Sequence, residues 1–479
     1  MNGHAAFSEV RTASRIARSV AATDTALSRW ADARHWFEEL GHRYRARVER
    51  IPLDALNGWR TRPETGDIAH RSGRFFSVEG LDVHMPASPV ARWSQPILNQ
   101  PEIGILGILV KEFDGVPHCL MQAKFEPGNL NGLQLSPTVQ ATRSNYTGVH
   151  RGRPVPYLEY FADTSSHRVL ADVRQSEHGS WFDRKRNRNM VVEVAGEVEV
   201  LDGFRWLTLG QLHRLLAVDH VVHGDTRTVL SCLPFAGPGL DTALPPGGDV
   251  FRAGLLRSCA GDGGLHGMDD ILRWITEART RTEVSARQIP LHQVRGWRRT
   301  AEAISHESGR YFGVIGVDVS AEGREVAQWS QPLIEPYGTG VVAFLVSEIE
   351  GVLHVLMHAR AEPGFVDTVE LAPTLQCVPR NYEHLPAAAR PAFMDEVLRA
   401  RPDQIRFDAE LSEEGGRFYH ARIRHMIIEA DSDLGAGRPD FRWMTLHQLV
   451  DLLRHSHYLD IQARSLIACL HSLSGGAQS

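Results

Sequence analysis

Two neighbouring segments near residue 110 carry the strongest strand pattern in the chain. Residues 103–113 and 116–125 are rich in apolar and β-branched residues, and Asp114-Gly115 joins them. An Asp-Gly pair between two such segments is typical of a tight hairpin turn. The pattern recurs further along the chain, where Glu350-Gly351 stands at the turn. We therefore predict a β-hairpin at both positions.

Beyond the first hairpin, strand-like segments precede a helix. Alternation of apolar residues predicts further strands near 134–142, 168–174 and 189–200. Thr208 is a suitable N-cap for a helix over 209–218, because its hydroxyl can accept a hydrogen bond from a free amide of the first turn. Four leucines share one face of that helix: Leu209, Leu212, Leu215 and Leu216. This combination predicts an α+β unit with a mainly antiparallel sheet.

Alternate residues differ in chemistry along the second hairpin strand and the strand that follows it. Successive side chains of a strand point to opposite faces. On the first of these strands His118, Leu120, Gln122, Lys124 and Glu126 share one face, and Cys119, Met121, Ala123 and Phe125 share the other. On the next strand Gln134, Ser136, Thr138 and Gln140 oppose Leu135, Pro137, Val139 and Ala141. Each strand is thus predicted to pair an apolar core face with a polar face.

Most of the chain is an internal repeat. Residues 70–84 reappear at 306–320, an offset of 236 (306 minus 70). The same offset relates 93–97 to 329–333, 118–128 to 354–364, 135–140 to 371–376, Asn145-Tyr146 to Asn381-Tyr382, and 190–193 to 426–429. Residues 204–212 match 441–449, so one residue was inserted in the second copy. Chance does not hold such a register over so long a segment, and we infer a tandem duplication.

Each copy is preceded by a segment with helical periodicity. Residues 5–48 predict two helices, and residues 268–285 show the same feature before the second copy. Residues 236–267 are rich in Gly and Pro and are interpreted as a linker. We therefore divide the chain into a first domain, 1–235, and a second domain, 268–479. Two domains are also expected because 479 residues exceed the size that a single core usually supports.

The polar face of the second copy repeats that of the first with a few substitutions. Its members are His354, His358, Arg360, Glu362, Glu370, Thr374 and Gln376. His358 replaces Gln122, Arg360 replaces Lys124, Glu370 replaces Gln134 and Arg380 replaces Ser144. One wet side of an antiparallel sheet would explain such a face without any site. However, amides and hydroxyls with a cation and a carboxylate suit the hydroxyls and phosphates of a sugar nucleotide.

Composition narrows the classes of partner. The formal charge is -6 and no basic stripe with interleaved aromatic residues occurs, so we expect no nucleic-acid partner. No apolar segment approaches the roughly 18 residues of a membrane span and no signal peptide is recognisable, so we expect a cytoplasmic protein. The five cysteines form no C-x-x-C pair and are expected to be reduced. Lys111, Lys124 and Lys185 are the only lysines, and each is informative because Lys, unlike Arg, can exchange a proton near neutral pH.

Motifs of several common enzyme classes are missing from the sequence. G-x-S-x-G, Walker A and H-E-x-x-H do not occur, which disfavours the corresponding hydrolases, NTPases and zinc proteases. A near-match to G-x-G-x-x-G begins at Gly261, but its last position is His266 and no predicted strand precedes it. The histidines show no metal-ligand spacing with the cysteines. We therefore expect neither a nicotinamide cofactor nor a metal site.

The segments WSQPI, QAKFEPG and LSPTVQATRSNY, with their second-copy partners, resemble those of NDP-hexose 2,3-dehydratases, enzymes of deoxysugar biosynthesis. The resemblance covers residues 50–220 and 289–470. It implies a homodimer whose subunits contain two Nudix-like domains, each a mixed or antiparallel sheet with packed helices. Each domain would hold a nucleotide-sugar pocket, of which only one need be catalytic. The Nudix hydrolase box is missing, which disfavours metal-dependent pyrophosphate cleavage.

The resemblance also implies a reaction, elimination of the carbon-2 hydroxyl of dTDP-4-keto-6-deoxyglucose. The 4-ketone acidifies the carbon-3 proton, a base removes that proton, and the enolate expels the hydroxyl. The product is a 3,4-diketo-2,6-dideoxy sugar nucleotide, formed without an external cofactor and passed to an NADPH-dependent 3-ketoreductase. Such a site requires a base, a stabiliser of the enolate and an acid.

Candidates for these roles lie on the polar faces of both copies. The candidate bases are Glu126 and Glu362, the enolate stabilisers are Lys124 and Arg360, and the acids are Tyr146, Tyr382 and His358. Candidate substrate-binding residues are Trp93, Gln95, Gln122, Gln134, Thr138, Gln140, Arg143, Asn145, Trp329, Gln331, Glu370, Thr374, Gln376, Arg380 and Asn381. The two tryptophans suit either stacking on the base or anchoring the core. Any single candidate for a catalytic role is also compatible with binding substrate or holding a loop.

Two other functions are compatible with the same pattern. One is a non-catalytic nucleotide-sugar-binding protein with two degenerate pockets, and the other is a Nudix-type nucleotide-sugar hydrolase with divergent metal ligands. Between the two copies, the second has more titratable groups on its polar face, whereas the first keeps one of the three lysines. Both pockets are therefore candidates for the catalytic site.

Overall fold

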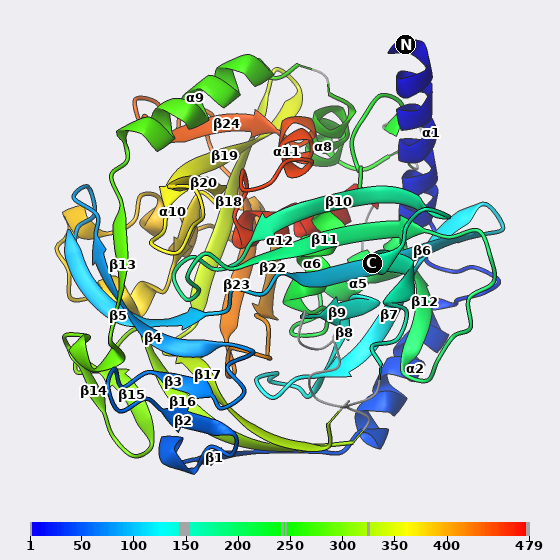
Figure 1. Ribbon diagram of the computed structural model, residues 1–479. Helices are drawn as coiled ribbons and strands as arrows, with labels where there is room; N and C mark the ends of the chain where they lie inside the picture. Colours follow the sequence, from blue (N-terminus) through cyan, green and yellow to red (C-terminus); the bar gives the residue numbers. More distant parts are fainter. Residues whose placement is uncertain are drawn as a thin grey trace.

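Four β-sheets, two from each repeat, surround a central group of helices (Figure 1). The computed structural model describes residues 2–142, 154–240, 244, 247–261, 263–322 and 326–475, with side chains from residue 12 onward except that of residue 387. Sheets and helices occur in both halves in matching order. The predicted duplicated α+β architecture is therefore confirmed.

Each repeat contributes one seven-stranded sheet. The first has the order β10-β11-β6-β7-β12, with β8 on β7 and β9 on β6. Its strands are β6 (Gly104–Phe113), β7 (Val116–Phe125), β8 (Leu133–Ser136), β9 (Val139–Ala141), β10 (Arg168–Ser176), β11 (Arg186–Glu193) and β12 (Phe204–Thr208). The second sheet matches it with β18 (Gly340–Ile349), β19 (Val352–Ala361), β20 (Val369–Ala372), β21 (Leu375–Cys377), β22 (Ile405–Ser412), β23 (Arg422–Glu429) and β24 (Phe441–Thr445). Both sheets are mixed, because β6 pairs in parallel with β11 and β18 with β23.

Both predicted hairpins are confirmed, as β6–β7 and β18–β19. Asp114 and Gly115 have φ of 49° and 79°, and Glu350 and Gly351 have φ of 51° and 82°. Two successive residues with positive φ form the turn whose twist matches that of the flanking strands. The turn residues thus fix the register of the two strands that lead into the polar segments.

The two smaller sheets exchange a strand between the repeats. The first contains β2 (Trp59–Thr61), β3 (Ile68–His70), β4 (Ser77–His84) and β5 (Arg92–Asn99), and the second contains β14 (Trp297–Arg299), β15 (Ala303–His306), β16 (Phe312–Ala321) and β17 (Gln328–Pro336). β13 (Ser285–Ile289) pairs with β4, whereas β1 (Ala46–Ile51) pairs with β16. The first strand of each repeat therefore completes a sheet of the other repeat. The two predicted domains share their sheets and are not separate bodies.

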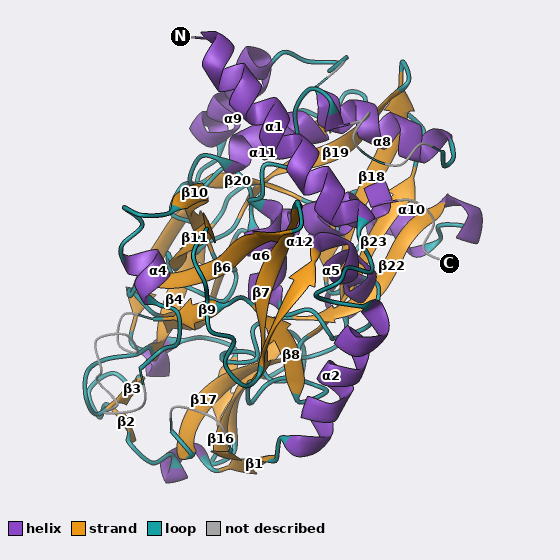
Figure 2. Ribbon diagram, turned by 90° about the vertical axis from the view of Figure 1, so that its right-hand side faces the viewer, coloured by secondary structure: helices purple, strands orange, loops and turns teal. Residues whose placement is uncertain are grey.

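Helices from both repeats pack between the two large sheets (Figure 2). α5 (Leu209–Leu216) and α6 (Gly224–Ser231) belong to the first repeat, and α11 (Leu446–Leu453) and α12 (Ile461–Ser472) to the second. Thr208 and Thr445 close capping boxes with Gln211 and Gln448, which confirms the predicted helix start. One hydrophobic cluster contains residues of both halves, among them Leu212 and Leu466. The repeats thus share one main core.

Two helices precede each repeat, which corrects the predicted linker. α1 (Asn2–Ala21) and α2 (Trp30–Arg43) precede the first repeat, and α8 (Val250–Ala260) and α9 (Met268–Arg281) precede the second. α8 lies inside 236–267, the segment interpreted as a linker. Phe251, Leu255 and Cys259 give it a buried face at helical spacing, Asp249 caps its start, and Gly261 ends it in the left-handed conformation. The apolar pattern of this helix is short, and the high Gly and Pro content around it led to the linker interpretation.

The predicted polar face of β7 is also largely covered. His118 is fully buried and its Nε2 lies 3.1 Å from the Thr25 hydroxyl. Leu120 packs in a second core with Phe161 of α4 (Glu159–Ala162). β7 is therefore buried on both sides for most of its length, as is expected for a central strand between two cores. Only its carboxyl end opens into a cavity.

Candidate functional site

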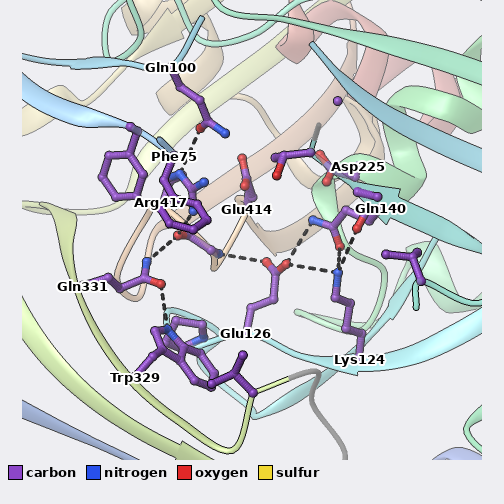
Figure 3. Close-up of a pocket in the computed structure, with 18 of the residues that line it drawn as sticks. Phe75, Gln100, Lys124, Glu126, Gln140, Asp225, Trp329, Gln331, Glu414 and Arg417 are labelled. Carbon is purple, nitrogen blue, oxygen red and sulfur yellow. Dashed lines mark hydrogen bonds and ion pairs between the residues drawn. The ribbon is translucent and has the colours of Figure 1, made fainter. Parts of the chain in front are cut away.

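A cavity of about 910 Å³ lies where the end of β7 meets the second repeat (Figure 3). Its volume is in the range of small-molecule sites in proteins. Polar residues from both repeats line it: His70, Gln100, Lys124, Glu126, Gln140, Lys185, Asn187 and Asp225 from the first, and Gln328, Trp329, Gln331, Glu414 and Arg417 from the second. The exchanged strands bring these two sets together. The site therefore belongs to neither repeat alone.

Three predicted residues form a hydrogen-bonded group at the end of β7. Lys124 Nζ donates to Gln140 Oε1 at 2.7 Å, and Gln140 Nε2 donates to Glu126 Oε1 at 3.0 Å. Lys124 Nζ also lies 3.8 Å from Glu126 Oε1. Lys124 and Glu126 are both buried. This group places one ammonium and one carboxylate at the cavity wall in a fixed relation.

The second oxygen of Glu126 binds groups from both repeats. His223 Nε2 lies 2.9 Å from Glu126 Oε2, and the Gly416 backbone N–H donates to the same oxygen at 2.9 Å. The Asp225 backbone N–H donates to His223 Nδ1 at 3.1 Å, so the Nε2 proton faces Glu126. The carboxylate is thus oriented by one side chain and by the backbone of the other repeat.

Trp329, Gln331 and Arg417 form the wall supplied by the second repeat. Trp329 Nε1 donates to Gln331 Oε1 at 2.8 Å, and Gln331 Nε2 donates to the Gly416 carbonyl at 2.7 Å. Arg417 Nε donates to Gln100 Oε1 at 3.0 Å, and its guanidinium lies 4.2 Å from the centre of the Phe76 ring. Burial lowers the pKa of Arg417, but a guanidinium stays charged near neutral pH. This wall offers an aromatic face beside a cation.

Asp225, Glu414 and Lys185 complete the cavity and were not predicted from the sequence. Burial raises the pKa of the Asp225 carboxyl well above its usual value, and neighbouring carboxylates reinforce that rise against the opposing effect of His223. Burial also lowers the pKa of Lys185 to about 8. The scarcity of lysine was the one sequence signal for Lys185. Asp225 and Glu414 lie outside the segments whose alternation was recognised, and only the fold brings them here.

The second repeat keeps the same frame around Glu362. Arg360 Nε lies 3.2 Å from Glu362 Oε1, and Gln376 Nε2 donates to that oxygen at 3.3 Å. Trp93 Nε1 donates to Gln95 Oε1 at 2.8 Å, and Gln95 Nε2 donates to the Ser180 carbonyl at 2.7 Å. Several ionisable groups of the first site are replaced. Trp181 stands for Arg417, His178 for Glu414, Gln462 for Asp225 and Ala421 for Lys185.

Several predicted site residues serve the sheets and not the cavity. Thr138 and Thr374 each bond two backbone groups of the central strands, Leu109 and Leu120 in one repeat and Leu345 and Leu356 in the other. Gln134 donates to Ser412 and Glu370 accepts from Ser176, in both cases across the repeats. All four residues are buried, so their polar groups need hydrogen-bond partners within the protein. Alternation alone does not separate such residues from ligand contacts.

The remaining predicted residues have other surroundings or lie outside the description. His358 stacks on Phe441 with ring centres 4.3 Å apart, and burial lowers its pKa to about 3. Tyr382 packs against the second repeat's core, and Asn381 Oδ1 accepts from the Tyr311 backbone N–H. Gln122 and Arg380 are not among the described residues that line the cavity. Arg143, Asn145 and Tyr146 lie outside the described residues.

No group of three or more His, Cys, Asp or Glu side chains in the described part of the chain is arranged to hold a metal ion. Of the helices that the structure describes, none is both long and apolar enough to cross a membrane.

Comparison with known proteins identifies the family. The model of the family described as NDP-hexose 2,3-dehydratase matches residues 30–233 and 268–470. Proteins named dTDP-4-dehydro-6-deoxy-alpha-D-glucopyranose 2,3-dehydratase are similar to this chain. The one from Saccharopolyspora spinosa is 54% identical and covers 89% of this chain and 88% of its own length. The one from Amycolatopsis orientalis is 48% identical and covers 97% of this chain and 96% of its own length. The one from Streptomyces violaceoruber is 49% identical and covers 91% of this chain and 96% of its own length. The chain belongs to the NDP-hexose 2,3-dehydratase family.

Proposed function

We propose that this protein is a sugar-nucleotide 2,3-dehydratase, a carbon–oxygen lyase that removes the carbon-2 hydroxyl of dTDP-4-keto-6-deoxyglucose. The observation that carries the assignment to this site is the cavity of about 910 Å³ in which Lys124, Glu126 and Asp225 face one space. Elimination beside a ketone needs a base, a cation and an acid. The names of the relatives, at 48–54% identity, support the same reaction.

The reaction is balanced without an external oxidant or reductant. Removal of the carbon-3 proton gives an enolate of the 4-ketone, and its electron pair forms the carbon-2–carbon-3 double bond as the carbon-2–oxygen bond breaks. The hydroxyl leaves as water after taking up one proton. The resulting enol ketonises to the 3,4-diketo-2,6-dideoxy sugar, so the oxidation at carbon 3 offsets the reduction at carbon 2.

We assign the first steps to the group at the end of β7. Glu126 takes the carbon-3 proton, since its carboxylate lines the cavity and is oriented by His223 and the Gly416 N–H. Lys124 stabilises the enolate oxygen as a fixed cation. Trp329 offers a face for the thymine ring, and Arg417 provides a charge for the diphosphate.

The alternatives have less support. A binding-only protein would not need buried carboxyl groups and two lysines, Lys124 and Lys185, on the wall of its cavity. A Nudix-type hydrolase needs a cluster of carboxylates that holds a metal, and the described residues contain no such cluster. The relatives' names also describe neither activity.

Further features of the family resemblance stay proposals. We propose that each large mixed sheet with its packed helices is a Nudix-like module, on the strength of the parallel β6–β11 and β18–β23 pairs within otherwise antiparallel sheets. We also propose a cytoplasmic homodimer that acts in antibiotic deoxysugar biosynthesis. A reactive diketone as product requires a 3-ketoreductase as the next enzyme, with NADPH as its reductant.

Incubation of the purified protein with dTDP-4-keto-6-deoxyglucose tests the proposal. We expect substrate loss without added cofactor, release of free dTDP as the diketo sugar decays, and a 2,6-dideoxy product when a 3-ketoreductase and NADPH are present. Unchanged substrate with retained binding would favour the binding-only function. Magnesium-dependent release of a sugar phosphate would favour the hydrolase.

A further inference from the structure

Asp225 is a buried carboxyl on the cavity wall that the family resemblance did not point to. It stands in the first turn of α6, is 3% exposed and lines the cavity. Figure 3 shows it near Gln140 and on the same side of the view as Lys124, with Glu414 between it and Arg417. It is therefore placed beside the same ligand space as the Glu126 carboxylate.

The imidazole of His223 lies between these two carboxyl groups. Its Nε2 lies 2.9 Å from Glu126 Oε2, and its Nδ1 lies 3.9 Å from Asp225 Oδ2. Because the Nδ1 atom already accepts the Asp225 backbone N–H, the imidazole proton faces Glu126 and not Asp225. The same histidine thus supports Glu126 as a carboxylate and gives the Asp225 carboxyl no hydrogen bond from Nδ1.

The surroundings of Asp225 favour its protonated form. Burial disfavours the charged carboxylate, and the nearby carboxylates of Glu414, Glu177 and Glu126 add to this effect, whereas His223 opposes it. The two carboxyl groups at the cavity therefore have different surroundings: Glu126 accepts from His223 and the Gly416 N–H, whereas Asp225 is buried near other carboxyl groups. Pairs of carboxyl groups whose environments separate their pKa values act as an acid and a base in many enzymes.

We infer that Asp225 is the general acid that protonates the departing carbon-2 hydroxyl, an inference that rests on the proposed dehydratase function. In this step the carbon-2–oxygen bond breaks, the oxygen takes the Asp225 proton and leaves as water, and Asp225 becomes a carboxylate. The proton that Glu126 took from carbon 3 and the bulk solvent restore both groups afterwards. Glu126 starts the reaction and Asp225 completes the elimination.

The second repeat lacks this acid. Gln462 occupies the position of Asp225, and its amide donates to Glu413 Oε1 at 3.0 Å. An amide binds the neighbouring carboxylate but cannot deliver a proton near neutral pH. At this position the first repeat therefore has a side chain that can donate a proton, and the second repeat has one that only makes a hydrogen bond.

The Asp225→Asn variant in deuterated buffer tests the inference. Asn has the shape of a neutral carboxyl, so the fold is expected to be retained, but it cannot supply the proton. We expect elimination, measured as dTDP release, to fall by about 10²-fold or more. Deuterium should still enter carbon 3 of the recovered substrate, because Glu126 can form the enolate and return a solvent deuteron. Asp460→Asn, a buried Asp-to-Asn change in the second repeat, is the matched control and should keep both reactions.

Each outcome separates the hypotheses. Wild-type elimination by Asp225→Asn, or parallel loss of elimination and carbon-3 exchange in a folded variant, would overturn the role of Asp225. Asp225→Glu should recover part of the elimination, because it restores an acid. Should Asp225→Asn precipitate, Asp225→Ser carries the same expectation. If the wild-type protein itself shows neither exchange nor elimination, the proposed dehydratase function fails, irrespective of Asp225.

Discussion

The cavity at Glu126 and the matching group of residues around Glu362, which we call the first and second pocket, share a frame but differ in charge. In both, a glutamate at the end of a central strand accepts from a glutamine, and a tryptophan–glutamine pair from the other repeat completes the wall. The first pocket adds Asp225, Lys185 and Arg417, whereas the second has Gln462, Ala421 and Trp181 at those positions. The glutamate, the glutamine that bonds it and the tryptophan–glutamine pair are present in both copies, whereas Asp225, Lys185 and Arg417 are not, and Asp460 replaces the His223 that bonds Glu126.

The exchanged strands explain why both pockets kept that frame. Each pocket takes its glutamate from one repeat and its tryptophan from the other, because β1 and β13 complete the opposite repeat's small sheet. A change in the frame of either pocket therefore alters residues that also hold the shared core. We therefore propose that the first pocket is the catalytic one.

The largest expected effect comes from removing the two equivalent glutamates one at a time. Glu126→Gln should lower kcat by about 10²- to 10⁴-fold, because an amide cannot take the carbon-3 proton. Glu362→Gln should leave kcat almost unchanged. Deuterium exchange at carbon 3 should disappear in Glu126→Gln only. Equal and full activity in both variants would contradict the assignment of the base, and a larger loss in Glu362→Gln would move catalysis to the second pocket.

A second comparison concerns the stability of the fold at Gln134 and Glu370, two buried residues at equivalent positions of the two repeats. Burial raises the pKa of Glu370 to about 8, so its contribution to stability is present below the unfolded pKa and is lost as the pH rises through 8. Glu370→Gln copies the first repeat and keeps an acceptor for the Ser176 hydroxyl. We expect it to raise the free energy of unfolding by about 2–4 kcal/mol at pH 8 and to have little effect near pH 4.

Urea denaturation at the two pH values measures this effect. Gln134→Glu is the matched control, since it introduces the same buried carboxyl into the first repeat and should destabilise the protein at pH 8. Equal stability of wild type and Glu370→Gln at both pH values would show that the Glu370 carboxyl is solvated in the folded state.

Local patterns predicted the elements, and long-range contacts made the site. Asp114-Gly115 and Thr208 act through their own backbone neighbourhood, so their hairpin and helix cap were readable from the sequence. The repeat fixed the duplicated architecture for the same reason. Lys124, Glu126 and Gln140 were found because alternation groups them on one face, and the structure joins them by hydrogen bonds.

The rest of the site depends on contacts that no local pattern records. Gly416 and Arg417 reach Glu126 and Gln100 only because the repeats interlock, at separations of about 290 and 317 residues. Thr138 has the same alternation as Gln140 but bonds the backbone of β6 and β7. Polarity at a strand position therefore predicts a hydrogen bond, and only the fold shows whether its partner is a ligand or the protein.

Arg417 tests the charge difference between the pockets. Arg417→Gln should raise KM for the sugar nucleotide by about 10- to 150-fold, because charge-assisted hydrogen bonds contribute about 1.5–3 kcal/mol. The effect on kcat should be smaller, since the diphosphate lies away from the reacting carbons. Arg422→Gln, which removes an exposed arginine paired with Glu410, is the control. A fall in kcat without a change in KM would place Arg417 at the reacting end of the substrate.

Two glycines at matched inter-repeat contacts give the smallest expected difference. The Gly128 N–H donates to the Gly415 carbonyl and the Gly364 N–H to the Gly179 carbonyl, at 2.7 Å and 2.8 Å. A Cβ at Gly128 would overlap the Phe418 carbonyl oxygen, and one at Gly364 would overlap that of Phe182. Either alanine variant should therefore lower the free energy of unfolding by about 1–3 kcal/mol through overpacking.

Their effects on catalysis should differ, because only the first contact supports the pocket that we propose to be catalytic. Gly128→Ala displaces the segment whose Gly416 N–H orients Glu126, so kcat measured well below the melting temperature should fall by about three- to tenfold. Gly364→Ala displaces the corresponding segment beside Glu362 and should leave kcat near the wild-type value. Equal losses of kcat would mean that the interlocked backbone transmits strain to both pockets, and that the frame of the second pocket contributes to catalysis in the first.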